Sequence, residues 1–210
     1  VPQTTAGVPP LRKAVDGFVD GWVRSRLDGL QPDRPSPGAT WEDLANGCIA
    51  SWADFHREHP AASHGWYIDL DGRIAWRNNR LVTLRLRWES YTGGAHPNRG
   101  ETWVSFDSAT GARLGPGDLA GDTETLKNIA EKHFRQEKNI APDTDLNAAG
   151  WWFEDGVFSL PPDVAAVEEG LIIYWPPYAI GPYTAGETYL AVPREDIEHN
   201  PAPRIPPAPE

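Results

Sequence analysis

Hydrophobic residues recur at helical spacing near the start of the chain, and this pattern predicts two helices. From Leu11 to Leu30, apolar side chains return every three or four residues, which is typical of an amphipathic helix. A second helix is predicted from Trp41 to Glu58, with Thr40 as its N-cap and Asp43 completing a capping box. Its buried stripe is expected to contain Leu44, Cys48, Ile49, Trp52 and Phe55.

The pattern then changes to the short, alternating runs that are typical of strands. Four strands are predicted, at residues 65–70, 73–77, 81–89 and 101–107. Asp71-Gly72 is a strong hairpin signal between the first two, and Asn78-Asn79 and Ser108–Gly111 mark the next turns. Apolar and charged side chains alternate from Leu84 to Glu89, so this strand has one apolar face and one charged face.

The second half of the chain predicts a further helix followed by a second set of strands. A linker is predicted over 114–121, followed by a helix that Asp122 or Thr123 caps and that reaches about Asn139. Strands are predicted at 156–160, 171–175 and 187–193. Because helices and strands segregate, the fold class is α+β: N-terminal helices and an antiparallel meander, then a further helix and a second set of antiparallel strands.

This order divides the chain into four parts. We expect a tether over residues 1–10, a helix-helix-meander part over 11–119 and a helix-plus-strands part over 120–199 that forms one compact unit with it. A proline-rich tail would occupy 200–210. The chain contains no methionine, so we expect a mature or trimmed fragment, and any signal peptide or anchor would lie before Val1. It contains no apolar run of about 18 residues, the length that predicts a transmembrane helix.

The formal charge of −11 argues against a nucleic-acid partner, because phosphate backbones require a basic surface. A cationic protein would instead be attracted, and the alternative is that the charge only aids solubility. The single cysteine, Cys48, excludes an internal disulfide and a cysteine-based metal cluster. Its position on an apolar stripe favours a buried, inert thiol.

A glycine-containing loop, Tyr91–Asn98, follows the longest predicted strand. Gly93 and Gly94 allow the backbone to adopt φ > 0 or to pack very close to a neighbour. Tyr91, His96 and Asn98 are groups that a binding surface could use. His96 is either a ligand contact or proton donor, or a ring that bonds loop carbonyls and fixes the turn; we favour the second.

No catalytic residue, metal ligand or cofactor site is predicted. The sequence has no His-Glu-x-x-His and no Gly-x-Ser-x-Gly motif. His56, His59 and His64 form a loose group, but Pro60 ends the helix and a solvated helix end explains them better than a metal.

Ten tryptophans are heavy usage for a chain of this length. Trp22, Trp52, Trp88 and Trp103 fit core stripes, which is the commoner fate of tryptophan. The aromatic residues expected to be exposed, and able to stack on sugar rings, are Trp151, Trp152, Tyr178 and Tyr183.

Two loop motifs together resemble a bacterial envelope family. They are Tyr91-Thr92-Gly93-Gly94-Ala95-His96-Pro97-Asn98, followed by Phe106-Asp107 and Thr110-Gly111, and the run from Glu169-Gly170-Leu171 through Pro177-Tyr178-Ala179-Ile180-Gly181-Pro182-Tyr183. The family is the domain of unknown function in the extracytoplasmic half of anti-sigma-V (RsiV-like) proteins, which also precedes the catalytic domain of PdaC-type peptidoglycan deacetylases. The resemblance implies an exported α+β domain without a catalytic role of its own, and relatives that bind lysozyme.

Three functions therefore stay open. The first is a non-catalytic binding domain in which the Tyr91–Asn98 and Tyr178–Gly186 loops form or support a surface for lysozyme or another cationic partner. The second is a peptidoglycan- or glycan-binding accessory module, and the third and least favoured is a hydrolase that uses His96. The expected location is extracytoplasmic: periplasmic, secreted or anchored to the membrane.

Overall fold

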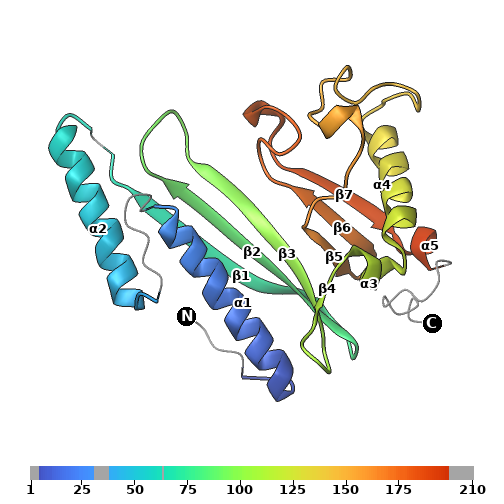
Figure 1. Ribbon diagram of the computed structural model, residues 1–210, viewed down its shortest axis with the longest axis horizontal. Coiled ribbons are helices and arrows are strands. Elements are labelled where there is room, and N and C mark those ends of the chain that lie inside the picture. Colours follow the sequence, from blue (N-terminus) through green and yellow to red (C-terminus); the bar gives the residue numbers. More distant parts are fainter. Residues whose placement is uncertain (1–4, 31–37, 63, 199–210) are drawn as a thin grey trace.

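The computed structural model describes residues 5–30, 38–62 and 64–198 and contains two antiparallel sheets, each associated with helices (Figure 1). The first half contains α1 (Pro9–Asp28), α2 (Trp41–Glu58), β1 (Tyr67–Arg77), β2 (Leu81–Tyr91), β3 (Asn98–Asp107) and β4 (Arg113–Leu114). The second half contains α3 (Pro116–Ala120), α4 (Thr123–Glu137), β5 (Val164–Val167), β6 (Gly170–Trp175), β7 (Thr188–Pro193) and α5 (Arg194–Ile197), with short 3-10 turns at Glu154–Gly156 and Tyr183–Ala185. The predicted α+β class is confirmed.

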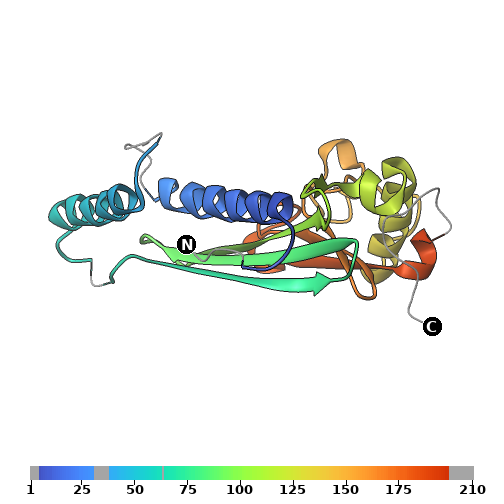
Figure 2. The ribbon, with the colours of Figure 1, turned by 90° about the horizontal axis from the view of Figure 1, so that it is seen from below.

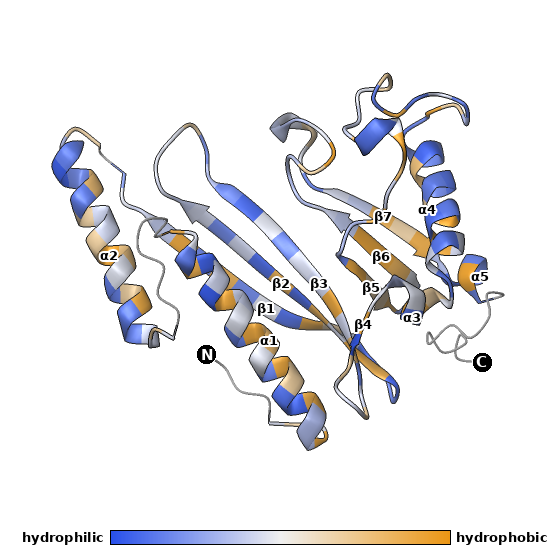
Figure 3. Cartoon of the chain, viewed as in Figure 1, coloured by the Kyte–Doolittle hydropathy of each residue, from blue (hydrophilic) through white to orange (hydrophobic). Residues whose placement is uncertain are grey.

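Helix α1 covers the apolar face of the sheet formed by β1, β2, β3 and β4, hereafter sheet A. Its buried residues Leu11 and Val15 pack against Leu84, Val104 and Phe106. Figure 3 shows hydrophobic positions along α1, whereas the halves of β2 and β3 next to the loop between them are mostly hydrophilic. The helix begins at Pro9, two residues before the predicted start, because proline fits the first turn of a helix, where no N–H partner is needed.

Helix α2 has its predicted bounds and cap, but its predicted burial is wrong. Thr40 and Asp43 form the capping box, with the Asp43 N–H donating to Thr40 Oγ1 over 3.2 Å. Of the expected stripe only Leu44 is buried; Ile49 is 64% exposed and Trp52 is 37% exposed. The reason is position: α2 extends beside α1 and beyond the sheet, as Figures 1 and 2 show, so no strand covers its apolar side.

Strand β1 is continuous, which makes the predicted hairpin at Asp71-Gly72 wrong. Gly72 lies within the strand opposite Leu86, and a Cβ at Gly72 would lie 2.8 Å from Leu86 Cδ2. The glycine therefore permits a close cross-strand approach rather than a turn. The predicted turn at Asn78-Asn79 is confirmed: Asn78 Oδ1 accepts from the N–H groups of Arg80 and Leu81 at 2.7 and 3.0 Å.

The second core lies between α4 and the sheet formed by β5, β6 and β7, hereafter sheet B. Phe134 on α4 is fully buried, and the rings of Trp151, Phe153, Phe158 and Trp175 surround it with centroids 5.1 to 6.0 Å away. Asp122, rather than Thr123, caps α4, and its carboxylate accepts from the Thr125 N–H over 2.6 Å.

Two expectations for this half are wrong, and one strand is absent from the predictions. Residues 156–160 form no strand, because Phe158 is drawn into the aromatic core and the preceding residues make a 3-10 turn. The linker over 114–121 contains the end of β4 and the short helix α3. Strand β5 was not predicted, since Val164–Val167 is short and follows prolines. The tail from residue 200 lies outside the described residues.

Sheet B packs against part of the charged face of sheet A. Buried Thr83 donates from its Oγ1 to the Ala166 carbonyl over 2.7 Å, and the Ala166 N–H donates to Ser105 Oγ over 3.0 Å. Next to these bonds, Trp103, Ala165 and Tyr174 form a small apolar cluster. Arg87 and Arg99 are exposed towards the end of this face that leads to the β2–β3 loop, and the candidate site lies there.

Candidate functional site

The two loops that the sequence singled out meet in space. The ring of His96, in the β2–β3 loop, stacks on the ring of Tyr183, in the β6–β7 loop, with centroids 3.7 Å apart and planes inclined by 14°. The Tyr183 hydroxyl donates to the Pro97 carbonyl over 3.1 Å. Residues far apart in the sequence are therefore held together by one stack and one hydrogen bond.

The β2–β3 loop has the backbone that its glycines predicted. Gly93 and Gly94 have φ of +100° and +101°, a region that side-chain-bearing residues rarely adopt. The Tyr91 hydroxyl closes the loop by donating to the Gly94 carbonyl over 3.0 Å. The Tyr91 ring also lies 6.3 Å from that of Tyr67 on β1. Asn98 is exposed and opens β3 opposite Ser90.

The contacts of His96 stabilise its own loop and do not present a reactive nitrogen to an open cleft. Its Nδ1 lies 2.9 Å from the Pro97 carbonyl, and because a carbonyl only accepts, that nitrogen carries the proton and donates. With one face against Tyr183, the ring is half-buried. This geometry supports the interpretation that His96 fixes the turn.

The other aromatic candidates divide into an exposed pair and a packed residue. Tyr178 is 54% exposed, has φ of +70°, and its ring lies 5.4 Å from that of Tyr183. Trp152 is 52% exposed, and its backbone N–H donates to the Ile180 carbonyl over 3.1 Å, which connects it to the same loop. Trp151 is packed edge-on against Phe134 instead, so it is poorly placed for a ligand.

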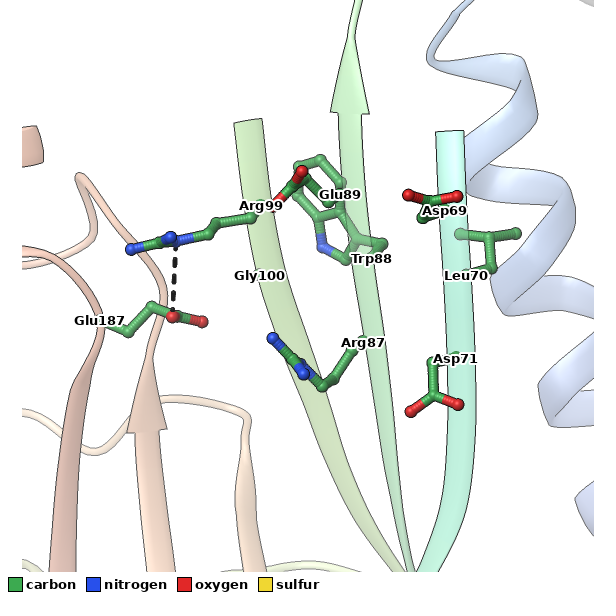
Figure 4. Close-up of a pocket in the computed structure, with 9 residues that line it drawn as sticks. All are labelled: Asp69, Leu70, Asp71, Arg87, Trp88, Glu89, Arg99, Gly100 and Glu187. Carbon is green, nitrogen blue, oxygen red and sulfur yellow. Dashed lines mark ion pairs between the residues drawn. The ribbon is translucent and has the colours of Figure 1, made fainter. Parts of the chain in front are cut away.

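A charged pocket of about 270 Å³ lies beside the joined loops, between the open face of sheet A and the start of β7 (Figure 4). Its lining residues are Asp69, Leu70, Asp71, Arg87, Trp88, Glu89, Arg99, Gly100 and Glu187. Sequence reasoning missed this pocket. The alternating charges of β2 predicted one charged wall, but nothing in the sequence indicated that β1 and Glu187 would form the other walls of the pocket.

Three arginines of this face, Arg85, Arg87 and Arg99, have carboxylate partners. Arg85 and Arg87 both pair with Glu101, with Arg85 Nε 2.8 Å from Oε2 and Arg87 Nε 3.3 Å from Oε1. In the pocket wall Arg99 Nε lies 3.6 Å from Glu187 Oε2, the pair marked in Figure 4. The Glu101 side chain is only 1% exposed, so its charge depends on these partners.

The aspartates of β1 differ from the arginines. Over the residues that the structure describes, neither Asp69 nor Asp71 makes an ion pair or a side-chain hydrogen bond. Glu89 accepts a hydrogen bond from the Tyr67 hydroxyl over 2.7 Å, which raises the pKa of Tyr67 to about 12. The charges left without a partner in the pocket are therefore negative.

A buried hydrogen-bond network fixes the floor of the pocket to sheet B. The Tyr174 hydroxyl accepts from the Glu101 N–H and donates to Glu187 Oε1, both over 2.9 Å. Burial, followed by the Glu187 carboxylate, raises the pKa of Tyr174 far above its ordinary value. Burial, together with Glu101, also raises the pKa of Tyr189 to about 12. Both tyrosines therefore stay neutral hydrogen-bonding groups at physiological pH.

The described ranges 5–30, 38–62 and 64–198 hold neither a metal-ligand cluster nor a membrane-spanning helix. There, no group of three or more His, Cys, Asp and Glu side chains is arranged to hold a metal ion. His56 stacks on Trp52 and His59 packs on Phe55, so these histidines pair with aromatic rings of α2. In the same ranges, no helix combines the length and apolarity needed to cross a membrane.

The fold and the comparisons define a class of domain rather than an activity. Residues 118–195, less than half of the chain, match the model of a family described as a protein of unknown function, DUF3298. No protein of curated function matches the chain.

Two solved structures of DUF3298 proteins are similar to this one. The member from Bacteroides fragilis NCTC 9343 has a TM-score of 0.59 and 18% identity, over 78% of this chain and 70% of that chain. The protein from Pseudomonas aeruginosa PAO1 has a TM-score of 0.57 and 20% identity, over 90% of this chain and 79% of that chain. At these identities the likeness concerns the fold alone.

Proposed function

We propose that this protein is an exported, non-catalytic binding domain of the cell envelope that recognises a cationic protein such as lysozyme. The observation that carries the proposal is the charge of the pocket beside the joined loops. Arg87 and Arg99 are paired with carboxylates there, whereas Asp69 and Asp71 are not. A Lys or Arg side chain of a partner would supply the missing counter-charge.

The size and setting of the pocket fit this use. About 270 Å³ lies below the usual range for drug-sized ligands, so it suits one or two protruding side chains of a larger partner. Tyr178, exposed on the neighbouring loop, offers the amphipathic aromatic surface that interfaces favour. The net charge of −11 would steer a cationic partner towards this surface. The resemblance to RsiV-like domains is the reason for naming lysozyme and the envelope.

The test is calorimetric titration with lysozyme at low and moderate salt. We expect saturable, near-stoichiometric binding that survives moderate salt, and a loss of about tenfold or more in the double variant Asp69→Asn/Asp71→Asn, because a hydrogen bond to a charged group contributes about 1.5–3 kcal/mol. The matched control is Glu124→Gln/Asp143→Asn, which removes the same charge from exposed positions elsewhere.

The outcomes separate three explanations. Equal weakening in both double variants would mean that only the overall charge attracts lysozyme, and binding that disappears at moderate salt would mean the same. Full affinity in the Asp69/Asp71 variant would overturn the assignment of the pocket. No binding by the unchanged protein would reject lysozyme as the partner.

A glycan-binding module is the second candidate, and the exposure of Trp152 and Tyr178 favours it. Both side chains are more than half exposed, and both belong to the segments around the β6–β7 loop. Aromatic faces of this kind can stack on sugar rings. Titration with soluble peptidoglycan fragments, followed by tryptophan fluorescence, should then give a saturable change that Trp152→Ala and Tyr178→Ala each weaken. An unchanged spectrum would remove this candidate.

A further inference from the structure

The two sides of sheet A differ in whether the outward-facing backbone groups have hydrogen-bond partners. On the side of β3 away from β2, β4 pairs with Ser105 and Phe106, and the N–H groups of Glu101 and Trp103 donate to Tyr174 Oη and Asp163 Oδ1, each over 2.9 Å. On β1, no hydrogen bond from any described residue reaches the backbone groups that face away from β2. An edge of 11 residues is thus left as a template for another strand.

The side chains along this edge are complementary to themselves. Opposite charges, Asp71 and Arg73, flank Gly72 on this strand. The next residue on each side, Leu70 or Ile74, is apolar. Asp71 and Arg73 are both exposed, and within the described ranges no ion pair engages either one. Ile74 is 53% exposed, which is unusual for isoleucine on a long strand.

We propose that β1 pairs with β1 of a second copy, antiparallel, about a two-fold axis at Gly72. In that register Asp71 of each copy faces Arg73 of the other, and Leu70 of each faces Ile74 of the other. Both pairings occur twice, as a two-fold interface requires. The two sheets A then form one continuous sheet across the axis.

The fold limits this pairing to one short register. Because side chains alternate between faces, a shift of one residue would place Asp71 opposite the apolar side of the partner strand. The bulge between Ile74 and Trp76 ends the straight part of β1, so the paired segment covers about Leu70 to Ile74. A segment of this length predicts a reversible dimer that depends on concentration.

Self-association has a consequence for the charged pocket. Asp71 also lines the pocket, so the dimer would neutralise one of its two unpaired aspartates. Dimerisation and a cationic partner should therefore compete. The dimer itself does not depend on the proposed function, because it is tested with this protein alone.

The test exchanges the charges at the axis and measures association by sedimentation velocity over a wide concentration range. The wild-type protein is expected to dimerise. Asp71→Arg and Arg73→Asp should each weaken self-association by about tenfold or more, because each places like charges opposite one another twice. Mixed together, the two variants should form a heterodimer, since each supplies the charges that the other lacks.

The mixture is the decisive measurement. Glu124→Arg makes the same charge change as Asp71→Arg on an exposed part of α4, and it should leave the dimer unchanged. A mixture that associates no better than either variant alone would overturn the proposal, even if both variants fold. So would a wild-type protein that stays monomeric at its highest soluble concentration, or a dimer that tolerates both substitutions.

Discussion

The ring of His96 lies flat against the ring of Tyr183, and the Tyr183 hydroxyl bonds to the carbonyl of the residue that follows His96. Through this relationship, each of the two loops holds the other in place. The loop of sheet A is thereby attached to sheet B at a point where no strand pairing joins them.

The first prediction concerns the energy of this junction. Tyr183→Phe keeps the ring and removes the hydrogen bond to Pro97, so it should cost about 1 kcal/mol of unfolding free energy. His96→Ala and Tyr183→Ala each remove the stack, and a double-mutant cycle between these two substitutions should give a coupling of about 0.5–1.5 kcal/mol. Urea denaturation measures Tyr183→Phe and the four proteins of the cycle. Additive effects would show that the two loops do not support one another.

The second prediction concerns Glu101, the buried carboxylate of the sheet A face. Glu101→Gln leaves Arg85 and Arg87 without their counter-charge, so the unfolding free energy should fall by about 3 kcal/mol. Glu124→Gln is the matched control, because its ion pair with Lys127 is exposed and should contribute less than about 1 kcal/mol. Similar losses in the two variants, measured by urea unfolding, would contradict the account of a buried network.

The third prediction concerns pH. Burial raises the pKa of Asp163 above its ordinary value of 3.8, against the opposing hydrogen bond from the Trp103 N–H. As the pH rises above 3.8, the unfolded chain loses this proton before the folded protein does. The unfolding free energy therefore decreases until the pH passes the folded pKa of Asp163, and above that pH the loss stays constant.

Asp163→Asn keeps an acceptor oxygen and removes this titration. The stability of the variant relative to the wild type should therefore increase as the pH rises through that window, and stay constant above it. Thermal unfolding at a series of pH values measures the difference. Asp143→Asn, at an exposed position, is the control. Parallel curves for wild type and Asp163→Asn would contradict the prediction.

The fourth prediction compares two tryptophans on the apolar stripes of α1 and α2. Trp22 is buried and its Nε1 donates to Thr102 Oγ1 over 3.1 Å, so Trp22→Ala should cost about 3–5 kcal/mol. Trp52 is 37% exposed and stacks on His56 of its own helix, so Trp52→Ala should cost about 1 kcal/mol or less. Chemical denaturation checks both. An equal loss would mean that α2 is packed against a surface in solution.

Local signals in the sequence determined several elements of this protein. The capping box of Thr40 and Asp43, the turn at Asn78-Asn79 and the positive φ of Gly93 and Gly94 depend on residues within a few positions of one another. Their energetics are local, so they can be predicted without the fold. The α+β class followed in the same way, from segregated periodicities.

The tertiary structure decided which segments pair with one another and which side chains are buried. Asp71-Gly72 has the composition of a turn, but pairing of β1 with β2 along its whole length stabilises an extended strand there. Likewise, α2 has an apolar stripe, yet its position beyond the sheet leaves Trp52 uncovered. Long-range pairing and burial outweigh local propensity because they involve many more contacts per residue.

The candidate site belongs mostly to this second category. The sequence by itself named His96, Tyr178 and Tyr183 as residues of two noteworthy loops, and it supplied the alternating charges of β2. Only the folded chain brought His96 onto Tyr183, buried Glu101 between two arginines, and left Asp69 and Asp71 without partners. The physical reason is that stacking, ion pairing and desolvation are set by distances between residues far apart in the sequence, which periodicity does not contain.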